Sequence, residues 1–406
     1  MKPGKIAIFL AVFVLIAIAS PAFSQTAKAG APSGTPIKIG GSLPLTGIAS
    51  EQAKWIASGY EFWAEDINKR GGLLGRPVKL TIYDDESNAE KAVTYFERAI
   101  TVDKVDLVFG GYPGTSDVAL MPLMEKYKKV FVGQGGHMQS FQQGYTYSFA
   151  SPPLMGNWAY LCVAGIYNDL IPKAQWPKPA AVYTMNNVIG LSARVPLLKW
   201  LEQNGIPVAV DEIYNLPLSN AAPLISKAKA KGAEAMLCMS LFDDGVMLTQ
   251  AAKATNYNPK LIWQQLASTI PAWMKEMGAD GNNVTADGWW NPHLPYPGND
   301  VINAGAKAKF PNLQDTPTWF GIGYCWVKTL EVAVQGAGTL DNTKIRDYLR
   351  SRTFDLPYMK GVTFDKAGLP APYGYVVQTT NGRVELIWPK NVATVKLVYP
   401  RPPWNR

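Results

Sequence analysis

Apolar runs and helix-spaced apolar positions alternate along the first half of the chain. The run that opens at Ile37 and the run Val105–Phe109 indicate buried strands, while Val93, Phe96 and Ile100 recur at helical spacing between them. Strands that alternate with helices of about 10 to 15 residues are typical of a parallel, doubly wound sheet. The pattern therefore predicts an α/β fold.

The stretch 37–87 is the first complete unit of this pattern. A strand leads into the loop Pro44–Gly47, a helix follows and ends at Gly71–Gly72, and a second strand runs into Tyr83–Ser87. Strand, helix and strand in this order form one βαβ unit. Both strands end in small polar loops, and such loops are where open α/β sheets hold ligands.

A second set of alternating elements begins after residue 153. Its predicted helices and strands are, in chain order, the helix Leu154–Leu170, the strand Ala180–Thr184, the helix Leu191–Gln203, the strand Val208–Ile213, the helix Ala221–Lys231, the strand Ala235–Met239, the helix Asp243–Thr255 and the strand Leu261–Trp263. Farther on, Thr318–Val334 and Asn342–Arg352 have helical spacing, and Tyr375–Trp388 has the pattern of a hairpin with a type I′ turn at Asn381–Gly382. Two sets of alternations predict two doubly wound lobes.

The chain length supports two domains, and the charge pattern argues against a nucleic-acid partner. The 406 residues exceed the size at which a single hydrophobic core keeps growing. The formal net charge is +8, but the lysines are dispersed, and the sequence has no basic stripe interleaved with aromatic residues. We therefore expect an ordinary solvated surface and no nucleic-acid binding.

Residues 1–24 have the pattern of a cleaved signal peptide. Lys2 and Lys5 precede the apolar run Ile6–Ala19, and Ala22–Ser24 offers small residues to a signal peptidase. The run is shorter than the roughly 20 apolar residues that a membrane-spanning helix needs, although an uncleaved anchor is the alternative interpretation. Residues 25–36, which are rich in Ala, Gly and Pro, are expected to form a flexible lead-in.

Cysteines and histidines are too few and too scattered to predict a metal site. Cys162, Cys238 and Cys325 each lie between apolar residues, which is typical of buried free thiols, and the sequence does not decide whether two of them pair. The two histidines are His137 and His293. The chain has no Gly-x-Ser-x-Gly elbow, His-Glu-x-x-His motif or Walker loop. We therefore expect no metal, no cofactor and no catalytic residue, and hence a protein that is not an enzyme.

Four short motifs resemble those of a known family. They are Pro44–Gly47, Asp66–Asn68 with the glycines that follow it, Tyr83–Asp85 and Gly361–Asp365. In this order and spacing behind a signal peptide, they resemble the periplasmic solute-binding proteins of the branched-chain amino-acid ABC transporter type, also called type I periplasmic binding proteins. The resemblance extends over nearly the whole mature chain.

The resemblance implies a fold of two Rossmann-like lobes joined by a three-segment hinge. It places the chain crossings near Ser151–Pro152, Trp289–Asn291 and Lys360–Val362. The first lobe then comprises 37–151 plus 290–360, and the second comprises 152–289 plus 361–406.

The resemblance also implies a function in transport. Proteins of this type are free in the periplasm once the signal peptide is removed, and their two lobes close on a small molecule like a hinge. They then deliver this ligand to an inner-membrane ABC permease, with which they associate transiently. We expect a monomer. A periplasmic ligand-sensing receptor of the same fold is the alternative, because a fold does not determine a function.

The candidate ligand residues lie in loops that follow predicted strands. The strongest candidate is Gly110–Ser116, because backbone N–H groups at a helix N-terminus favour an anion, and the family uses this loop to hold the ligand's carboxylate. A plain helix cap is the alternative. The full set of predicted ligand residues is Leu45, Thr46, Tyr112, Gly114, Thr115, Ser116, Gly135, Gly136, His137, Phe242, Asp243, Gln264 and Gln265.

The loop after the strand Leu261–Trp263 bears on the choice of ligand. Family members that bind amino acids commonly have an acid here to pair with the α-ammonium group, whereas this chain has Gln264 and Gln265. Burying an ammonium group without an anion is costly. Either Asp243 or Asp244 takes this role for a small amino acid, or the ligand is a hydrophobic or aromatic carboxylate or amide.

Overall fold

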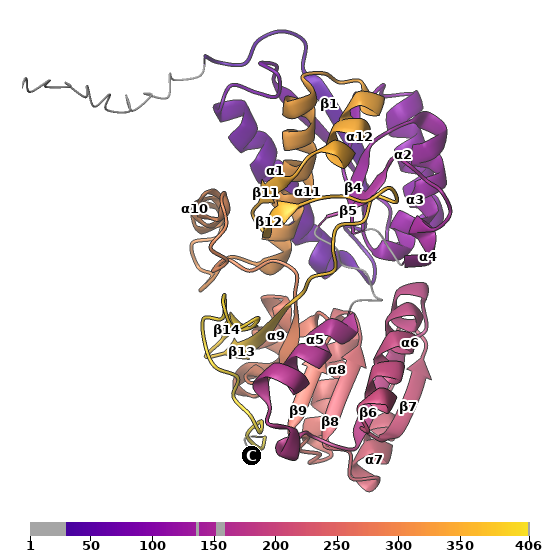
Figure 1. Cartoon of the computed structure of the whole chain (residues 1–406), viewed down its shortest axis with the longest axis vertical. Coiled ribbons are helices and arrows are strands. Elements are labelled where there is room, and N and C mark those ends of the chain that lie inside the picture. The colour runs from indigo at the N-terminus through magenta and orange to yellow at the C-terminus, as the bar shows by residue number, and fades with distance from the viewer. Residues whose placement is uncertain (1–29, 135–137, 152–158, 405–406) are drawn as a thin grey trace, which may run out of the picture. The chain divides into compact units, whose positions relative to one another are not determined.

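The computed structural model describes residues 30–134, 138–151 and 159–404. The predicted signal peptide, residues 25–29 of the lead-in and the candidates Gly135, Gly136 and His137 lie outside these ranges. The chain divides into two units, 1–30 and 31–406, and the description below concerns the second unit (Figure 1). Within the described ranges, no helix combines the length and the apolar character that a membrane crossing would require.

The N-terminal part alternates strands and helices as predicted. Its elements are β1 (Ile37–Leu43), α1 (Ser50–Lys69), β2 (Val78–Asp84), α2 (Ala89–Thr101), β3 (Leu107–Val108), α3 (Gly114–Tyr127), β4 (Phe131–Gly133), α4 (Met138–Phe141) and β5 (Ser148–Ala150). Strand β1 lies between β2 and β3, and all three run parallel. Strands β4 and β5 form a separate parallel pair.

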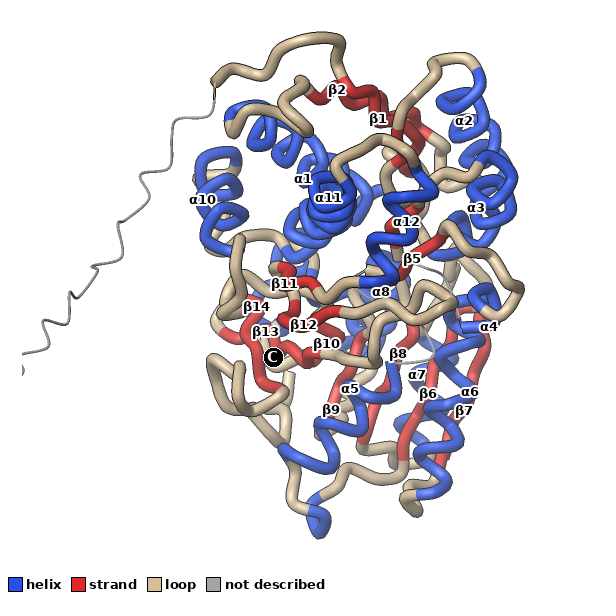
Figure 2. The backbone as a smooth tube through the Cα atoms, turned by 45° about the horizontal axis from the view of Figure 1, so that its top comes forward, coloured by secondary structure: helices blue, strands red, loops and turns tan. Residues whose placement is uncertain are grey.

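The middle of the chain builds most of a seven-stranded sheet. Its elements are α5 (Ala159–Gly165), a π-helical turn (Ile166–Leu170), a 3₁₀ turn (Lys173–Gln175), β6 (Ala180–Met185), α6 (Val188–Gln203), β7 (Val208–Tyr214), α7 (Ala222–Ala230), β8 (Ala235–Met239), α8 (Phe242–Ala254), β9 (Leu261–Gln264), a 3₁₀ turn (Ala267–Thr269), α9 (Ala272–Met277), a 3₁₀ turn (Gly278–Gly281) and β10 (Thr285–Gly288). Strands β7, β6, β8, β9 and β10 are neighbours in this order, and each pair is parallel (Figure 2).

The C-terminal part supplies helices near the first sheet and a hairpin to the second. Its elements are α10 (Asn299–Lys309), α11 (Thr318–Ala337), α12 (Asn342–Ser351), β11 (Phe354–Leu356), β12 (Met359–Val362), β13 (Tyr375–Thr380) and β14 (Arg383–Trp388). Strand β13 is antiparallel to β10 and to β14. Asn381 and Gly382 between β13 and β14 both have positive φ, at 50° and 78°. Because a type I′ turn requires positive φ at both central positions, the predicted turn is confirmed.

Helices α1 and α11 pack closely because glycines face each other's backbone. A Cβ atom at Gly59 would lie 2.3 Å from the carbonyl oxygen of Phe320, and one at Gly323 would lie 2.4 Å from that of Ile56. Larger residues would therefore force the two helices apart. This contact fixes α11, which is distant in sequence, against the first helix of the chain, as Figures 1 and 2 both show.

The predicted fold class, α/β with two doubly wound lobes, is confirmed by this architecture. Residues after Lys360–Val362 still contact the N-terminal part of the chain. Strand β12 pairs with β11, and the N–H of Ala150 donates to the carbonyl oxygen of Gly368 at 3.1 Å. The domain boundaries given above stay predictions. All three cysteines are buried and free.

Candidate functional site

A pocket of about 520 Å³ lies where the carboxyl ends of the parallel strands meet. From the N-terminal part it is lined by residues that follow β1, β2, β3 and β4, and from the seven-stranded sheet by residues at or after the ends of β6, β7, β8, β9 and β10. The lining residues are Ile48, Ala49, Ser87, Tyr112, Pro113, Gly114, Thr115, Gln134, Met185, Asn186, Asn187, Ile189, Asn215, Leu216, Leu241, Gln265, Leu266 and Trp289. We call this space the ligand pocket.

The N-terminus of α3 forms one wall of the ligand pocket. Gly114 and Thr115 are its first two helical residues and line the pocket, and no side chain caps the helix at Pro113. The N–H groups of Ser116 and Asp117 both donate hydrogen bonds to the carbonyl oxygen of Pro113, at 2.9 and 3.2 Å. The open end of a helix of this length suits a negatively charged or carbonyl oxygen.

Aromatic rings form a second wall. Tyr112 and Trp289 both line the pocket, and Trp319 packs edge-on against each of them, with centroid separations of 5.2 and 4.9 Å. The indole N–H of Trp319 donates to Thr269 Oγ1 at 3.2 Å, which fixes the ring between its neighbours. Burial raises the pKa of the Tyr112 phenol well above its usual range, so the ring stays neutral. A flat or apolar ligand body fits such a wall.

The polar groups of the remaining wall are carboxamides. Among the described residues, Oε1 of Gln134 and Oε1 of Gln265 are buried and have no hydrogen-bond partner. Asn186 donates to Asn215 Oδ1 at 2.8 Å, and Asn187 Oδ1 caps α6 by accepting from the backbone of the third helical residue. Two buried acceptors therefore remain open, and a ligand with N–H or O–H donors would satisfy them.

No Asp, Glu, Lys, Arg or His occurs among the described residues that line the ligand pocket. Asp243 lies outside the lining and is exposed at its surface, while partial burial of its carboxylate, together with the charges of Glu51 and Glu276, raises its pKa. Asp244 is buried and accepts from the Tyr214 hydroxyl. The pocket thus offers no carboxylate to an ammonium group within the described ranges.

Adjacent glutamines have different environments. Gln264 is fully buried below the pocket floor, where Oε1 accepts from Ser240 at 2.6 Å and Nε2 donates to Thr249 at 2.8 Å and to the carbonyl oxygen of Gly245 at 3.2 Å. Gln265 lines the pocket, and its backbone N–H donates to Cys238 at 2.9 Å. Of the two, Gln264 is a core residue, and Gln265 is available to a ligand.

The predicted ligand residues fall into three groups. Tyr112, Gly114, Thr115 and Gln265 line the ligand pocket. The candidates that the structure places elsewhere are Leu45, Thr46, Ser116, Phe242, Asp243 and Gln264. The candidates outside the described residues are Gly135, Gly136 and His137.

Two of the outlying candidates have clear structural roles. The Thr46 hydroxyl donates to Asp84 Oδ2 at 2.9 Å, and its backbone N–H donates to Oδ1 at 3.2 Å, so this loop is tied to the end of β2. Phe242, at the start of α8, is buried in the core. Both residues support the loops that line the pocket.

Sequence reasoning missed the amides that follow β6 and β7. Asn186, Asn187 and Asn215 come directly after these strands and line the pocket, as does Gln134 after β4. The signal was present, because ligands of open α/β sheets bind at the carboxyl ends of strands. The same rule that pointed to Gly110–Ser116 would have found them.

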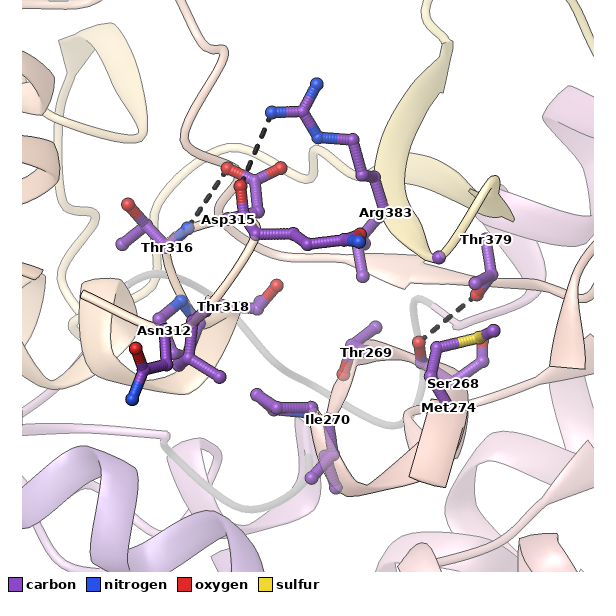
Figure 3. A pocket seen from close by; sticks show the side chains of 16 residues that line it. Ser268, Thr269, Ile270, Met274, Asn312, Asp315, Thr316, Thr318, Thr379 and Arg383 are labelled. Carbon is purple, nitrogen blue, oxygen red and sulfur yellow. Dashed lines mark hydrogen bonds between the residues drawn. The ribbon is translucent and has the colours of Figure 1, made fainter. Parts of the chain in front are cut away.

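Another pocket, of about 310 Å³, lies between Ser268–Met274, the loop 312–318 and the β13–β14 hairpin (Figure 3). Thr379 donates to the carbonyl oxygen of Ser268 at 3.3 Å, and Arg383 donates to that of Gln314 at 3.4 Å. The N-terminus of α11 at Thr318, which also lacks a side-chain cap, lines this pocket, but the space is smaller than the ligand pocket, and we do not assign it the solute. Within the described ranges, no cluster of three His, Cys, Asp or Glu side chains could hold a metal ion.

Comparison with known proteins assigns the family. A model of the periplasmic binding protein family matches residues 36–383. The chain belongs to this family. It is 24% identical over 336 residues to a leucine-, isoleucine-, valine-, threonine- and alanine-binding protein of Pseudomonas aeruginosa, covering 82% of this chain and 86% of that protein.

Other members of the family match over shorter lengths. A Leu/Ile/Val-binding protein homolog 7 of Brucella abortus is 24% identical over 237 residues, which cover 57% of this chain and 59% of the relative. The match thus spans little more than half the length of that relative.

Solved periplasmic binding proteins share the fold. The leucine-binding protein LivK of Thermotoga maritima has a TM-score of 0.77 at 18% identity, covering 86% of this chain and 97% of that structure. A solute-binding protein of Rhodopseudomonas palustris in complex with benzoate has a TM-score of 0.76 at 15% identity, covering 87% and 96%. At these identities the likeness shows the fold of the family and no more.

Proposed function

We propose that this protein is the substrate-binding component of an ABC transporter, and that it takes a small carboxylate or amide with an apolar or aromatic body. In this proposal the signal peptide directs the chain to the periplasm, where the mature protein acts as a monomer. It closes its two lobes on the solute and passes it to an inner-membrane permease. Membership of a binding-protein family supports the transport role.

The observation behind the solute class is that no charged side chain occurs in the part of the ligand-pocket lining that the structure describes. The N-terminus of α3 is suited to a carboxylate or carbonyl oxygen, and Tyr112 and Trp289 are suited to a flat body. The open acceptors on Gln134 and Gln265 are suited to N–H or O–H donors. An oxygen at one end of the ligand, an apolar body and a donor elsewhere would match all three walls.

An α-amino acid fits these walls less well. Among the described lining residues its ammonium group would meet amide oxygens but no carboxylate, and such a charge needs an anion to offset the cost of burial. Among proteins of the same fold, one Rhodopseudomonas palustris structure holds 3,4-dihydroxybenzoic acid and another holds benzoate, whereas a Streptococcus pneumoniae structure holds isoleucine. The described lining, which has no charged side chain, favours an aromatic carboxylate over an α-amino acid for this chain.

Calorimetry with the purified mature protein tests the solute class. 4-Hydroxybenzoate, benzamide and leucine form a minimal panel, since they differ in charge and shape. We expect 4-hydroxybenzoate or benzamide to bind at least about tenfold more tightly than leucine, a difference of about 1.4 kcal/mol. Tightest binding of leucine would refute the proposed class while leaving the transport role intact.

A matched pair of variants tests the role of the α3 N-terminus. Thr115 lines the pocket and Ser116, its neighbour, does not. Thr115→Ala should weaken binding of the preferred solute several-fold, because its side chain shapes the wall beside the helix end. Ser116→Ala should leave the affinity unchanged. Equal effects of the two variants would remove α3 from the ligand site.

A further inference from the structure

A separate pocket of about 500 Å³ lies at the amino end of the seven-stranded sheet. It is lined by Ala279–Asn283, which precede β10, by Thr380 and Asn381 of the hairpin turn, and by the C-terminal segment that contains Arg401. Strand β10 starts beside this pocket, and Trp289, directly after the end of β10, lines the ligand pocket. The two pockets therefore lie at opposite ends of one strand and share no residue.

The fold holds Arg401 firmly in this pocket. Its backbone N–H donates to the carbonyl oxygen of Lys260 at 2.8 Å, and the indole N–H of Trp404 donates to that of Tyr257 at 2.6 Å. The guanidinium carbon lies 3.5 Å from the centroid of the Trp404 ring, so the indole covers one face of the cation. In Figure 1 the yellow segment after β14 descends beside the sheet toward the end marked C.

Two of the three guanidinium nitrogens of Arg401 lack hydrogen-bond partners within the described ranges. Arg401 is only 7% exposed, and among the described residues its Nε and Nη2 groups have no partner. Burial lowers its pKa to about 10, against the opposing effect of Asp280, so it remains charged at neutral pH. Asp280 in the same pocket forms an ion pair with Lys253 at 2.6 Å. Two unsatisfied donors on a buried cation are costly, and the site is therefore suited to an anion.

We propose that this pocket binds a small monocarboxylate, held by Nε and Nη2 of Arg401. These two groups form one edge of the guanidinium plane, and their parallel N–H bonds match the two oxygens of a carboxylate. The hydroxyl of Thr380 is also buried without a partner among the described residues, and supplies a third donor. The nearby carboxylate of Asp280 disfavours an anion with two charges, such as phosphate.

The assignment is independent of the transported solute. No residue of the ligand pocket contributes to the Arg401 pocket, and the anchoring contacts of Arg401 come from residues before β9. Failure of the solute proposal would leave the Arg401 site standing, and the reverse also holds.

Side-chain NMR of the full mature protein, labelled with [¹⁵N]arginine, tests the site directly. The Nε–H signal of Arg401 is assigned by its loss in Arg401→Lys. Acetate is the probe, with chloride and inorganic phosphate at equal ionic strength as comparators. The matched internal control is Arg194, whose Nε already donates to Asp211 at 2.9 Å.

We expect millimolar acetate to move the Arg401 signal in a saturable way while the Arg194 signal stays in place. Thr380→Val, which keeps the shape of the side chain, should weaken the acetate response several-fold and provides a test if Arg401→Lys does not fold. A response that never saturates, or that equals the response to chloride, overturns the site. An equal response to phosphate overturns the carboxylate assignment.

Discussion

In the ligand pocket, the described buried atoms without hydrogen-bond partners include neutral amide oxygens, on Gln134 and Gln265; in the Arg401 pocket they include the donors of a cation. An unsatisfied neutral acceptor costs about 1–3 kcal/mol, and a charged group costs more. The carboxyl end is thus suited to recognition by dipoles and shape, and the amino end to recognition by charge. Four changes probe this contrast.

The largest expected effect is a difference in stability between variants of the neighbouring residues Gln264 and Gln265. Gln264→Ala removes the acceptor of Ser240 and the donor to Thr249 in the core, and should lower the free energy of unfolding by about 3 kcal/mol. Gln265→Ala removes a buried side chain whose Oε1 has no partner among the described residues, and should lower it by only about 1 kcal/mol. Urea denaturation measures both. Similar losses would mean that the two side chains do not differ as described.

The second effect is a pH dependence of stability from Asp244. Burial raises its pKa to about 6, above the usual 3.8, although the Tyr214 hydroxyl donates to it. Between these values the folded state binds more protons than the unfolded state, so stability falls as pH rises from about 4 to 6, by on the order of 2 kcal/mol.

Denaturation of Asp244→Asn across the same pH range checks this expectation. In the variant, stability should no longer fall with pH by the amount due to Asp244. The contribution of Asp85 should remain, because burial also raises the pKa of Asp85 to about 6. A slope identical to that of the parent protein would show that Asp244 is not the source.

The third effect is on solute affinity. Gln265→Leu keeps the size of the side chain but removes the open acceptor, and should weaken binding of the preferred solute about tenfold, or by about 1.4 kcal/mol. Asp243→Asn is the control, because Asp243 lies outside the lining, and its affinity should stay within about twofold of the parent. A large loss of affinity in Asp243→Asn would indicate that Asp243 pairs with an ammonium group of the solute.

The smallest expected effect is the response of solute affinity in the ligand pocket to salt. Since charged side chains do not occur in the described lining of the ligand pocket, a tenfold rise in salt should change solute affinity by less than about twofold. Acetate binding at Arg401 should weaken over the same range. Calorimetry measures solute affinity, and the NMR signal of Arg401 measures acetate affinity. Equal salt dependence of the two affinities would show that the two pockets do not differ in this way.

Most of the fold could be predicted because each element has a local signature. The helix indicated by the spacing of Val93, Phe96 and Ile100 begins at Ala89, since the Asn88 side chain caps it. The turn at Asn381–Gly382 follows from residues that tolerate positive φ. Helix α10 was missed, because Asn299–Lys309 is rich in Ala, Gly and Lys and buries only a narrow face. Its position depends on contacts with residues distant in sequence, which periodicity does not record.

The candidate site was predictable by loop but not by side chain. The loop Tyr112–Thr115 lines the pocket, as expected of a loop after a strand, whereas the loops after β6 and β7 were missed. Gln264 and Gln265 have the same chemistry in the sequence and different environments in the structure. Alternation decides which of them faces the core, and that depends on where β9 ends. The Arg401 pocket gave no local signal, because it joins the tail to the hairpin turn and to residues before β10, which lie more than a hundred positions earlier in the chain.

The row of rings Tyr112, Trp319 and Trp289 also has an optical consequence. Trp289 lines the pocket, and Trp319 lies behind it without joining the lining. Indole emission depends on the polarity and quenching groups around the ring, so solute entry should alter the light from Trp289 far more than that from Trp319. The molecule therefore contains its own fluorescent reporter of occupancy, with a reference chromophore one ring away.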